Sequence, residues 1–178
     1  MADAVVIPGR MFGPGAGMLM YASIAAERRG ANVHRHWWTT EPPSWTSRQS
    51  AHWVHGQAAA AVEKTGGTPL LIGKSLGSLA AGLAADRALP AVWLTPLLNL
   101  PQVIAGLERA PAPSLLIGGT ADTSWDGTIA RRVTPHVLEV VGADHGMCVP
   151  GQLTDSITVL AQVVTAIEVF LDTIGWPC

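Results

Sequence analysis

The chain has 178 residues, of which 48% are hydrophobic and 13% are charged. This composition excludes a disordered chain and predicts one globular domain over residues 1–178. The net charge is −2 with scattered Lys and Arg residues, so neither nucleic acid nor an anionic membrane is an expected partner.

Short apolar runs alternate with helical stretches along the whole chain, and Gly or Pro residues separate them. This alternation predicts a three-layer α/β sandwich in which helices cover both faces of a mostly parallel sheet. In chain order, we expect strands at residues 4–7, 32–38, 70–72, 91–95, 114–117 and 137–141. We expect helices at residues 18–29, 44–64, 76–87, 102–109, 125–132 and 153–174. Right-handed crossovers bring the carboxyl ends of parallel strands to one edge, where ligands bind.

Ser75 is the strongest candidate for a nucleophile. It lies in Gly73-Lys74-Ser75-Leu76-Gly77, directly after the third predicted strand and before a helix. A G-x-S-x-G pattern in this strand–turn–helix context exposes the serine hydroxyl on a sharp turn, and the two glycines let neighbouring backbone approach closely. The start of the following helix also supplies backbone N–H groups that stabilise negative charge.

A phosphate-binding loop is the alternative interpretation of this segment. Gly73-Lys74-Ser75 resembles the end of the G-x-x-x-x-G-K-[ST] pattern. The first glycine of that pattern would fall on Thr68, and the residues before Gly73 have the character of a strand rather than of a loop. The spacing therefore disfavours phosphate binding.

Two further residues at strand ends complete a candidate catalytic triad. Asp122 follows the fifth predicted strand and His145 follows the sixth. The chain order Ser, Asp, His is the order of α/β-hydrolases. The base must reach the nucleophile, and an acid must orient the base. Asp126 is the alternative acid, and Asp144 is expected to stabilise the turn beside His145.

Stabilisation of an oxyanion requires two backbone N–H donors. The first expected donor is Leu76, the residue after the nucleophile. The second is expected in the loop after the first strand, at Arg10 or, as the alternative, at Met11. Glycines at 13, 15 and 17 could suggest a dinucleotide-binding loop, but they lack the G-x-G-x-x-G spacing, and no acidic residue ends the second strand.

From Pro8-Gly9 through Ser75 and Asp122 to His145, the sequence resembles the α/β-hydrolase superfamily, and most of all its small, lidless members such as minimal bacterial lipases and esterases. The resemblance implies a six-stranded sheet of order 2-1-3-4-5-6. The sequence departs from the family pattern where Pro8 replaces the usual His before Gly9, and where Lys74 precedes the serine. No insertion between the fourth and fifth strands is long enough for a lid.

The function expected from these residues is hydrolysis of an ester, thioester or amide through an acyl-enzyme on Ser75, without a metal or organic cofactor. A non-catalytic binding protein and an acyltransferase on the same fold are the alternatives. The chain contains seven tryptophans, and we expect Met11, Trp37 and Trp125 to contact a small, apolar substrate.

The N-terminal residues and the cysteines bear on the compartment. Residues 1–7 lack the basic region and long apolar stretch of a secretory signal. No 18-residue apolar stretch free of Gly, Pro and charge predicts a membrane span. Cys148 and Cys178 form neither a disulfide framework nor a metal-binding spacing. The sequence therefore predicts a cytoplasmic protein, and it leaves the oligomeric state open.

Overall fold

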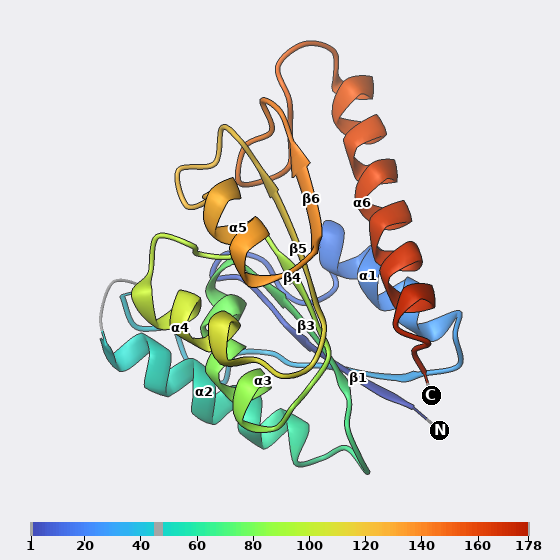
Figure 1. Ribbon diagram of the computed structural model, residues 1–178. Coiled ribbons are helices and arrows are strands. Elements are labelled where there is room, and N and C mark those ends of the chain that lie inside the picture. Colours follow the sequence, from blue (N-terminus) through green and yellow to red (C-terminus); the bar gives the residue numbers. More distant parts are fainter. Residues whose placement is uncertain (1, 45–47, 178) are drawn as a thin grey trace.

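The computed structural model describes residues 2–44 and 48–177 (Figure 1). Six parallel strands form one sheet in the order β2-β1-β3-β4-β5-β6. The strands are β1 (Asp3–Ile7), β2 (Asn32–Arg35), β3 (Leu70–Lys74), β4 (Ala91–Leu94), β5 (Ser114–Gly119) and β6 (His136–Val140). The strand order and the three-layer α/β architecture expected from the sequence are confirmed.

Helices cover both faces of the sheet (Figure 1). On one face lie α1 (Met18–Glu27) and α6 (Leu153–Thr173). On the other face lie α2 (Arg48–Val62), α3 (Ala81–Asp86), α4 (Pro101–Arg109) and α5 (Gly127–Val133). A 3₁₀ helix, η1 (Ser75–Ala80), joins β3 to α3. Between β4 and β5 the chain forms only α4 and its short connections, so no lid is built there.

The core consists of two layers, because successive side chains of a strand point to opposite faces of the sheet. Leu70 and Ile72 of β3 pack with α1 and α6. Leu71, which lies between them, packs with α2, α3 and α4. All three side chains are fully buried. Burial on both faces explains why β3 is a continuous apolar run rather than an alternating one.

Element boundaries differ from the sequence prediction at several strand ends. β2 ends at Arg35 rather than at Trp38, and the indole of Trp38, three residues later, donates a hydrogen bond to the carbonyl of Gly9. β3 continues to Lys74, which pairs with Leu94 of β4. The helix predicted at 44–64 is observed as α2, and residues 45–47 and Cys178 lie outside the described part of the chain.

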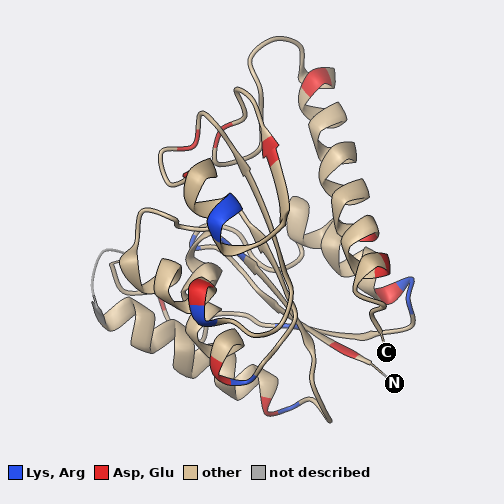
Figure 2. Cartoon of the chain, viewed as in Figure 1, with Lys and Arg blue, Asp and Glu red and all other residues tan. Residues whose placement is uncertain are grey.

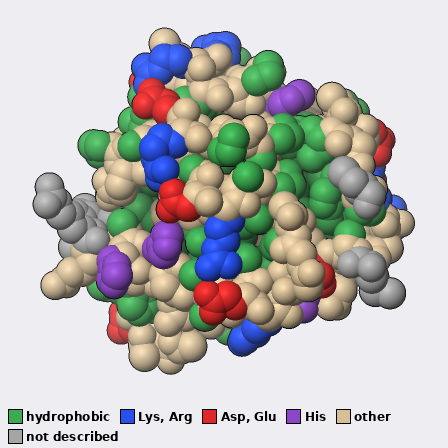
Figure 3. Space-filling model, turned by 60° about the horizontal axis from the view of Figure 1, so that its bottom comes forward, with side chains coloured by type: hydrophobic (Ala, Val, Ile, Leu, Met, Phe, Trp, Pro, Cys, Tyr) green, Lys and Arg blue, Asp and Glu red, His purple; other side chains and the backbone are tan. Residues whose placement is uncertain are grey.

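Helix α6 is long and apolar enough to cross a membrane by length and composition, with a mean hydropathy of 1.5. In the fold it lies beside α1 (Figure 1) and buries Val163, Ile167 and Phe170 in the core. The charged side chains are spread over the chain (Figure 2), and both signs are interspersed on the face shown in Figure 3. The absence of nucleic-acid and membrane partners stays a prediction.

Candidate active site

Ser75 occupies a sharp turn at the carboxyl end of β3. Its backbone φ is 50°, in the left-handed region that a non-glycine residue rarely adopts. A side chain on Gly77 would place its Cβ 2.5 Å from the carbonyl oxygen of Ile7, and one on Gly73 would place it 2.5 Å from the ring of Trp93. The two glycines of the motif are therefore required by close packing against β1 and β4, which fixes the strained turn around Ser75.

Three side chains from three strand ends form a continuous hydrogen-bonded chain. His145 Nε2 lies 2.8 Å from Ser75 Oγ, and His145 Nδ1 lies 2.7 Å from Asp122 Oδ2. In the tautomer protonated on Nδ1, His145 donates to the carboxylate and accepts from the serine hydroxyl. The structure thus brings together all three residues that the sequence singles out as the triad.

The Asp122 side chain is 2% exposed, whereas that of His145 is 41% exposed. Burial by itself would raise the pKa of Asp122, but hydrogen bonds from His145 and from the backbone N–H of Ser124, together with the nearby charge of Lys74, hold that pKa below its ordinary value. Asp122 therefore stays ionised at neutral pH and orients a histidine that solvent can reach.

The other two carboxylates near the site have structural roles. Asp126 is the N-cap of α5, where its Oδ1 accepts hydrogen bonds from the backbone N–H groups of Thr128 and Ile129. Asp144 accepts hydrogen bonds from the backbone of Gly146 and Cys148 and so closes the turn that carries His145. Of the three acids, Asp122 is the one hydrogen-bonded to the imidazole.

Two backbone N–H groups lie beside Ser75. Leu76 is the second residue of η1, so its N–H has no partner within that helix. Gly9 approaches Ser75 closely, because a Cβ on Gly9 would lie 3.5 Å from Ser75 Cβ. The carbonyl of Gly9 accepts a hydrogen bond of 2.9 Å from Trp38 Nε1. The N–H of Arg10 belongs to the same planar trans peptide, and so it points away from the indole.

Two cavities meet at Ser75 and His145. One has a volume of about 500 Å³ and is lined mainly by the loop after β1, including Met11 and Phe12, and by Met18 and Leu19 of α1. The other has a volume of about 290 Å³ and is lined by Leu97 and by the more polar segment 122–124. Ser75 therefore lies between an apolar cavity and a smaller, more polar one.

The three predicted substrate contacts are placed differently. Met11 lines the apolar cavity and is 81% exposed. Trp37 is 66% exposed, and its ring lies against Gly13 in the loop after β1. Trp125 packs over Gly118 and donates to Glu139, and it lines neither cavity at Ser75. Contact between Trp125 and a substrate stays a prediction, because its ring lies against Gly118 rather than in either cavity at Ser75.

Two residues at the site have contacts that the sequence does not predict. Ser78 Oγ donates to the carbonyl of Ser75 and accepts from the N–H of Leu97. It thereby ties η1 to the segment after β4. Trp38 orients the Gly9–Arg10 peptide, although the sequence indicates only that aromatic rings follow the second strand. The contacts of Ser78 with Leu97 and of Trp38 with Gly9 join residues 19 and 29 positions apart, and no local motif indicates them.

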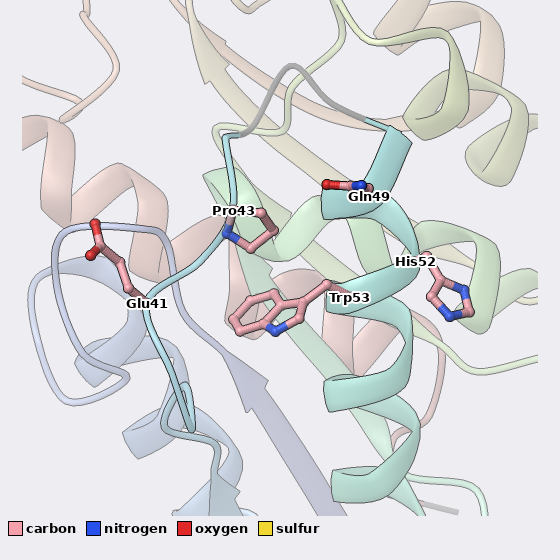
Figure 4. A pocket seen from close by; sticks show the side chains of 5 residues that line it. All are labelled: Glu41, Pro43, Gln49, His52 and Trp53. Atoms are coloured by element: carbon pink, nitrogen blue, oxygen red, sulfur yellow. The ribbon is translucent and has the colours of Figure 1, made fainter.

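A further cavity, of about 660 Å³, lies away from Ser75 between the segment after β2 and helix α2 (Figure 4). Figure 4 shows Glu41 and Pro43 on one side and Trp53, Gln49 and His52 of α2 on the other. None of the residues that line it belongs to the Ser75–His145–Asp122 chain, so this cavity is separate from the candidate active site.

No protein-family model matches this chain, and no curated protein matches it in sequence. Its structure is similar to that of a hydrolase of the α/β superfamily from Xanthomonas campestris, with a TM-score of 0.69, 19% identity, and coverage of 97% of this chain and 99% of that chain. It is similar to Est1E from Butyrivibrio proteoclasticus with bound ferulic acid (TM-score 0.69, 11% identity, 96% and 88% covered). It is also similar to a monoacylglycerol lipase from Paleococcus ferrophilus (TM-score 0.61, 17% identity, 92% and 94% covered).

These similarities show that the chain has the α/β-hydrolase fold, as the resemblance in sequence implies. The six-stranded sheet and the absence of a long insertion between β4 and β5 make it a minimal form of that fold. Of these structures, one is described as a hydrolase of the α/β superfamily and one as a monoacylglycerol lipase. Because the identities are low, the chemistry of this chain must be argued from its own site.

Proposed function

We propose that this protein is a serine hydrolase that cleaves an ester, or a thioester or amide, through an acyl-enzyme on Ser75. The observation that carries the proposal is the hydrogen-bonded chain from Asp122 through His145 to Ser75. A serine is weakly nucleophilic by itself, and an adjacent base that is oriented by a buried carboxylate activates it. The hydrolase and the lipase that share the fold add support.

In the proposed reaction, His145 Nε2 takes the proton from Ser75 Oγ as that oxygen attacks the acyl carbonyl. The N–H groups of Leu76 and Arg10 donate to the oxyanion of the tetrahedral intermediate. His145 then gives its proton to the leaving group, and the bond between the carbonyl carbon and that group breaks. Water, deprotonated by His145, attacks the acyl-enzyme. The bond between Ser75 Oγ and the acyl carbon then breaks, His145 returns the proton to Ser75 Oγ, and the acid is released. No cofactor takes part.

The apolar cavity supports a small substrate with an apolar portion. Its volume of about 500 Å³ and its lining by Met11, Phe12 and Met18 suit an aliphatic or aromatic group. The exposure of His145 leaves the site open to water, which favours hydrolysis over transfer to another alcohol. Cys148 is an exposed free thiol, which suits the cytoplasmic location that the proposal includes.

A fluorophosphonate probe tests this proposal, because it phosphonylates only an activated serine. We expect one adduct on Ser75, found by mass spectrometry, and loss of labelling together with loss of p-nitrophenyl acetate hydrolysis in Ser75→Ala. Ser23→Ala is the matched control, since Ser23 is buried in α1, where its Oγ donates to the carbonyl of Leu19. Absence of labelling in the folded wild-type protein would favour the non-catalytic alternative.

A further inference from the structure

Lys74, the residue before the nucleophile, extends from the last position of β3 to the segment that carries the base. Its side chain lies on the same face of the sheet as those of Leu70 and Ile72. Its Nζ donates a hydrogen bond of 3.2 Å to the backbone carbonyl of His145 and one of 3.0 Å to Oγ1 of Thr95. One ammonium group thus joins the segments after β4 and β6 at the catalytic edge.

Both segments that Lys74 joins contain strained backbone. Thr95 is buried and has a φ of 43°, although β-branched residues very rarely adopt positive φ. Met147, two residues after His145, has a φ of 62°. Such conformations persist only where the surrounding contacts over-determine them. The two hydrogen bonds of Lys74 are contacts of this kind, and one of them acts directly on the backbone of the base.

The surroundings of Lys74 disfavour the charged form of its side chain. Burial lowers the pKa of Lys74, while the charges of Asp122 and Asp144 act in the opposite direction. Even a half-buried ammonium is destabilising unless its donors are satisfied. An apolar side chain of similar length would fill the same space without that cost. Packing at position 74 therefore does not require a lysine, and the ammonium group of Lys74 must have another role.

We propose that Lys74 is a positioning residue, which holds the backbone of His145 so that its imidazole stays within hydrogen-bonding distance of Ser75. This inference rests on the proposed function. Lys74 acts through His145 and takes no part in bond making or breaking. Its charge also lies close enough to Asp122 to help keep that carboxylate ionised.

Lys74→Met tests the proposal, because it keeps the length of the side chain and removes the donor. We expect kcat to fall about 10- to 100-fold with KM changed by less than about twofold, since small displacements of a catalytic group have effects of this size. We also expect a melting temperature equal to or above that of the wild type. The matched control is Lys64→Met, at an exposed position in the turn after α2, which should leave kcat, KM and the melting temperature unchanged.

A second variant keeps the test decisive if Lys74→Met does not fold. Lys74→Ala shortens the side chain beside the apolar cavity, which it lines. We expect added propylamine, but not propanol, to restore the rate of fluorophosphonate labelling of Ser75, because the amine supplies the missing donor.

In the wild type, the downfield proton resonance of the hydrogen bond between His145 Nδ1 and Asp122 should be sharp, and it should broaden in Lys74→Ala.

The outcomes separate the two proposals. If the wild type is not labelled, the proposed function fails. If the wild type is labelled and Lys74→Met matches Lys64→Met in kcat, the positioning role is overturned. It is also overturned if propylamine and propanol have the same effect on Lys74→Ala.

Discussion

At the scale of single residues, the site depends on three carboxylates near the catalytic edge that have different roles. Asp122 bonds to the imidazole of His145, Asp126 caps a helix, and Asp144 closes a turn. Each role follows from which donors the backbone presents to the carboxylate. Asp122 alone is directed toward a side-chain donor that also contacts the nucleophile.

The first prediction concerns the acid of the triad. We expect Asp122→Asn to lower kcat for p-nitrophenyl acetate by about 10³- to 10⁴-fold, because an amide at this position no longer fixes the tautomer that accepts a proton from Ser75. Asp126→Asn is the matched control, since asparagine also caps helices well and should leave kcat within about twofold of the wild type. A larger loss in Asp126→Asn than in Asp122→Asn would contradict the assignment.

At the scale of elements, the turn between β3 and η1 is fixed by its fit between two strands. The carbonyl oxygen of Ile7, at the end of β1, occupies the space that a side chain on Gly77 would need, and the ring of Trp93 from β4 does the same at Gly73. The strained φ of Ser75 is thus imposed by neighbours on both sides of β3, and the exposure of its hydroxyl follows from this packing.

The second prediction tests this packing. We expect Gly77→Ala to lower the free energy of unfolding by about 1–3 kcal/mol, because the added Cβ would lie 2.5 Å from the backbone oxygen of Ile7. Activity should fall as well, since the turn at Ser75 must shift. Gly56→Ala in α2 serves as the control. Its Cβ would meet nothing within 4 Å, and we expect it to stabilise the protein by up to about 1 kcal/mol in urea denaturation.

At the scale of the whole molecule, function and stability are linked through the charges gathered at one edge of the sheet. The pKa of Asp122 is held below its ordinary value of 3.8 in the folded protein. Between the folded pKa and 3.8, the unfolded chain therefore binds more protons than the folded one, and stability rises with pH in that interval. The contribution is complete above pH 3.8 and is lost as the pH falls through the folded value.

The third prediction follows from this linkage. We expect the free energy of unfolding of the wild type to exceed that of Asp122→Asn at pH 7, and the difference to shrink as the pH is lowered below about 4, because protonation removes the charge that the variant lacks. Urea denaturation at a series of pH values measures the difference directly. A difference independent of pH from 7 to 3 would show that the charge of Asp122 does not stabilise the fold.

Much of this molecule can be predicted from local patterns. Apolar runs of strand length, separated by Gly and Pro, indicate the six strands. A strand that is buried on both faces of a parallel sheet needs apolar residues at successive positions. The G-x-S-x-G pattern and the positions of Asp122 and His145 after strands indicate the candidate site, because the fold brings strand ends to one edge. These signals lie within short segments, so they can be read without knowing the structure.

Other features were decided only by tertiary structure. Trp125 is adjacent to the site in sequence but packs back onto Gly118, whereas Trp38 holds the Gly9–Arg10 peptide from across the sheet edge. The contacts of Lys74 with Thr95 and His145 span 21 and 71 positions of the chain. The sequence determined which residue types stand at the ends of the strands. Only the folded backbone decided which side chains meet there, because a side chain's partners depend on turns and packing between segments that are distant in the chain.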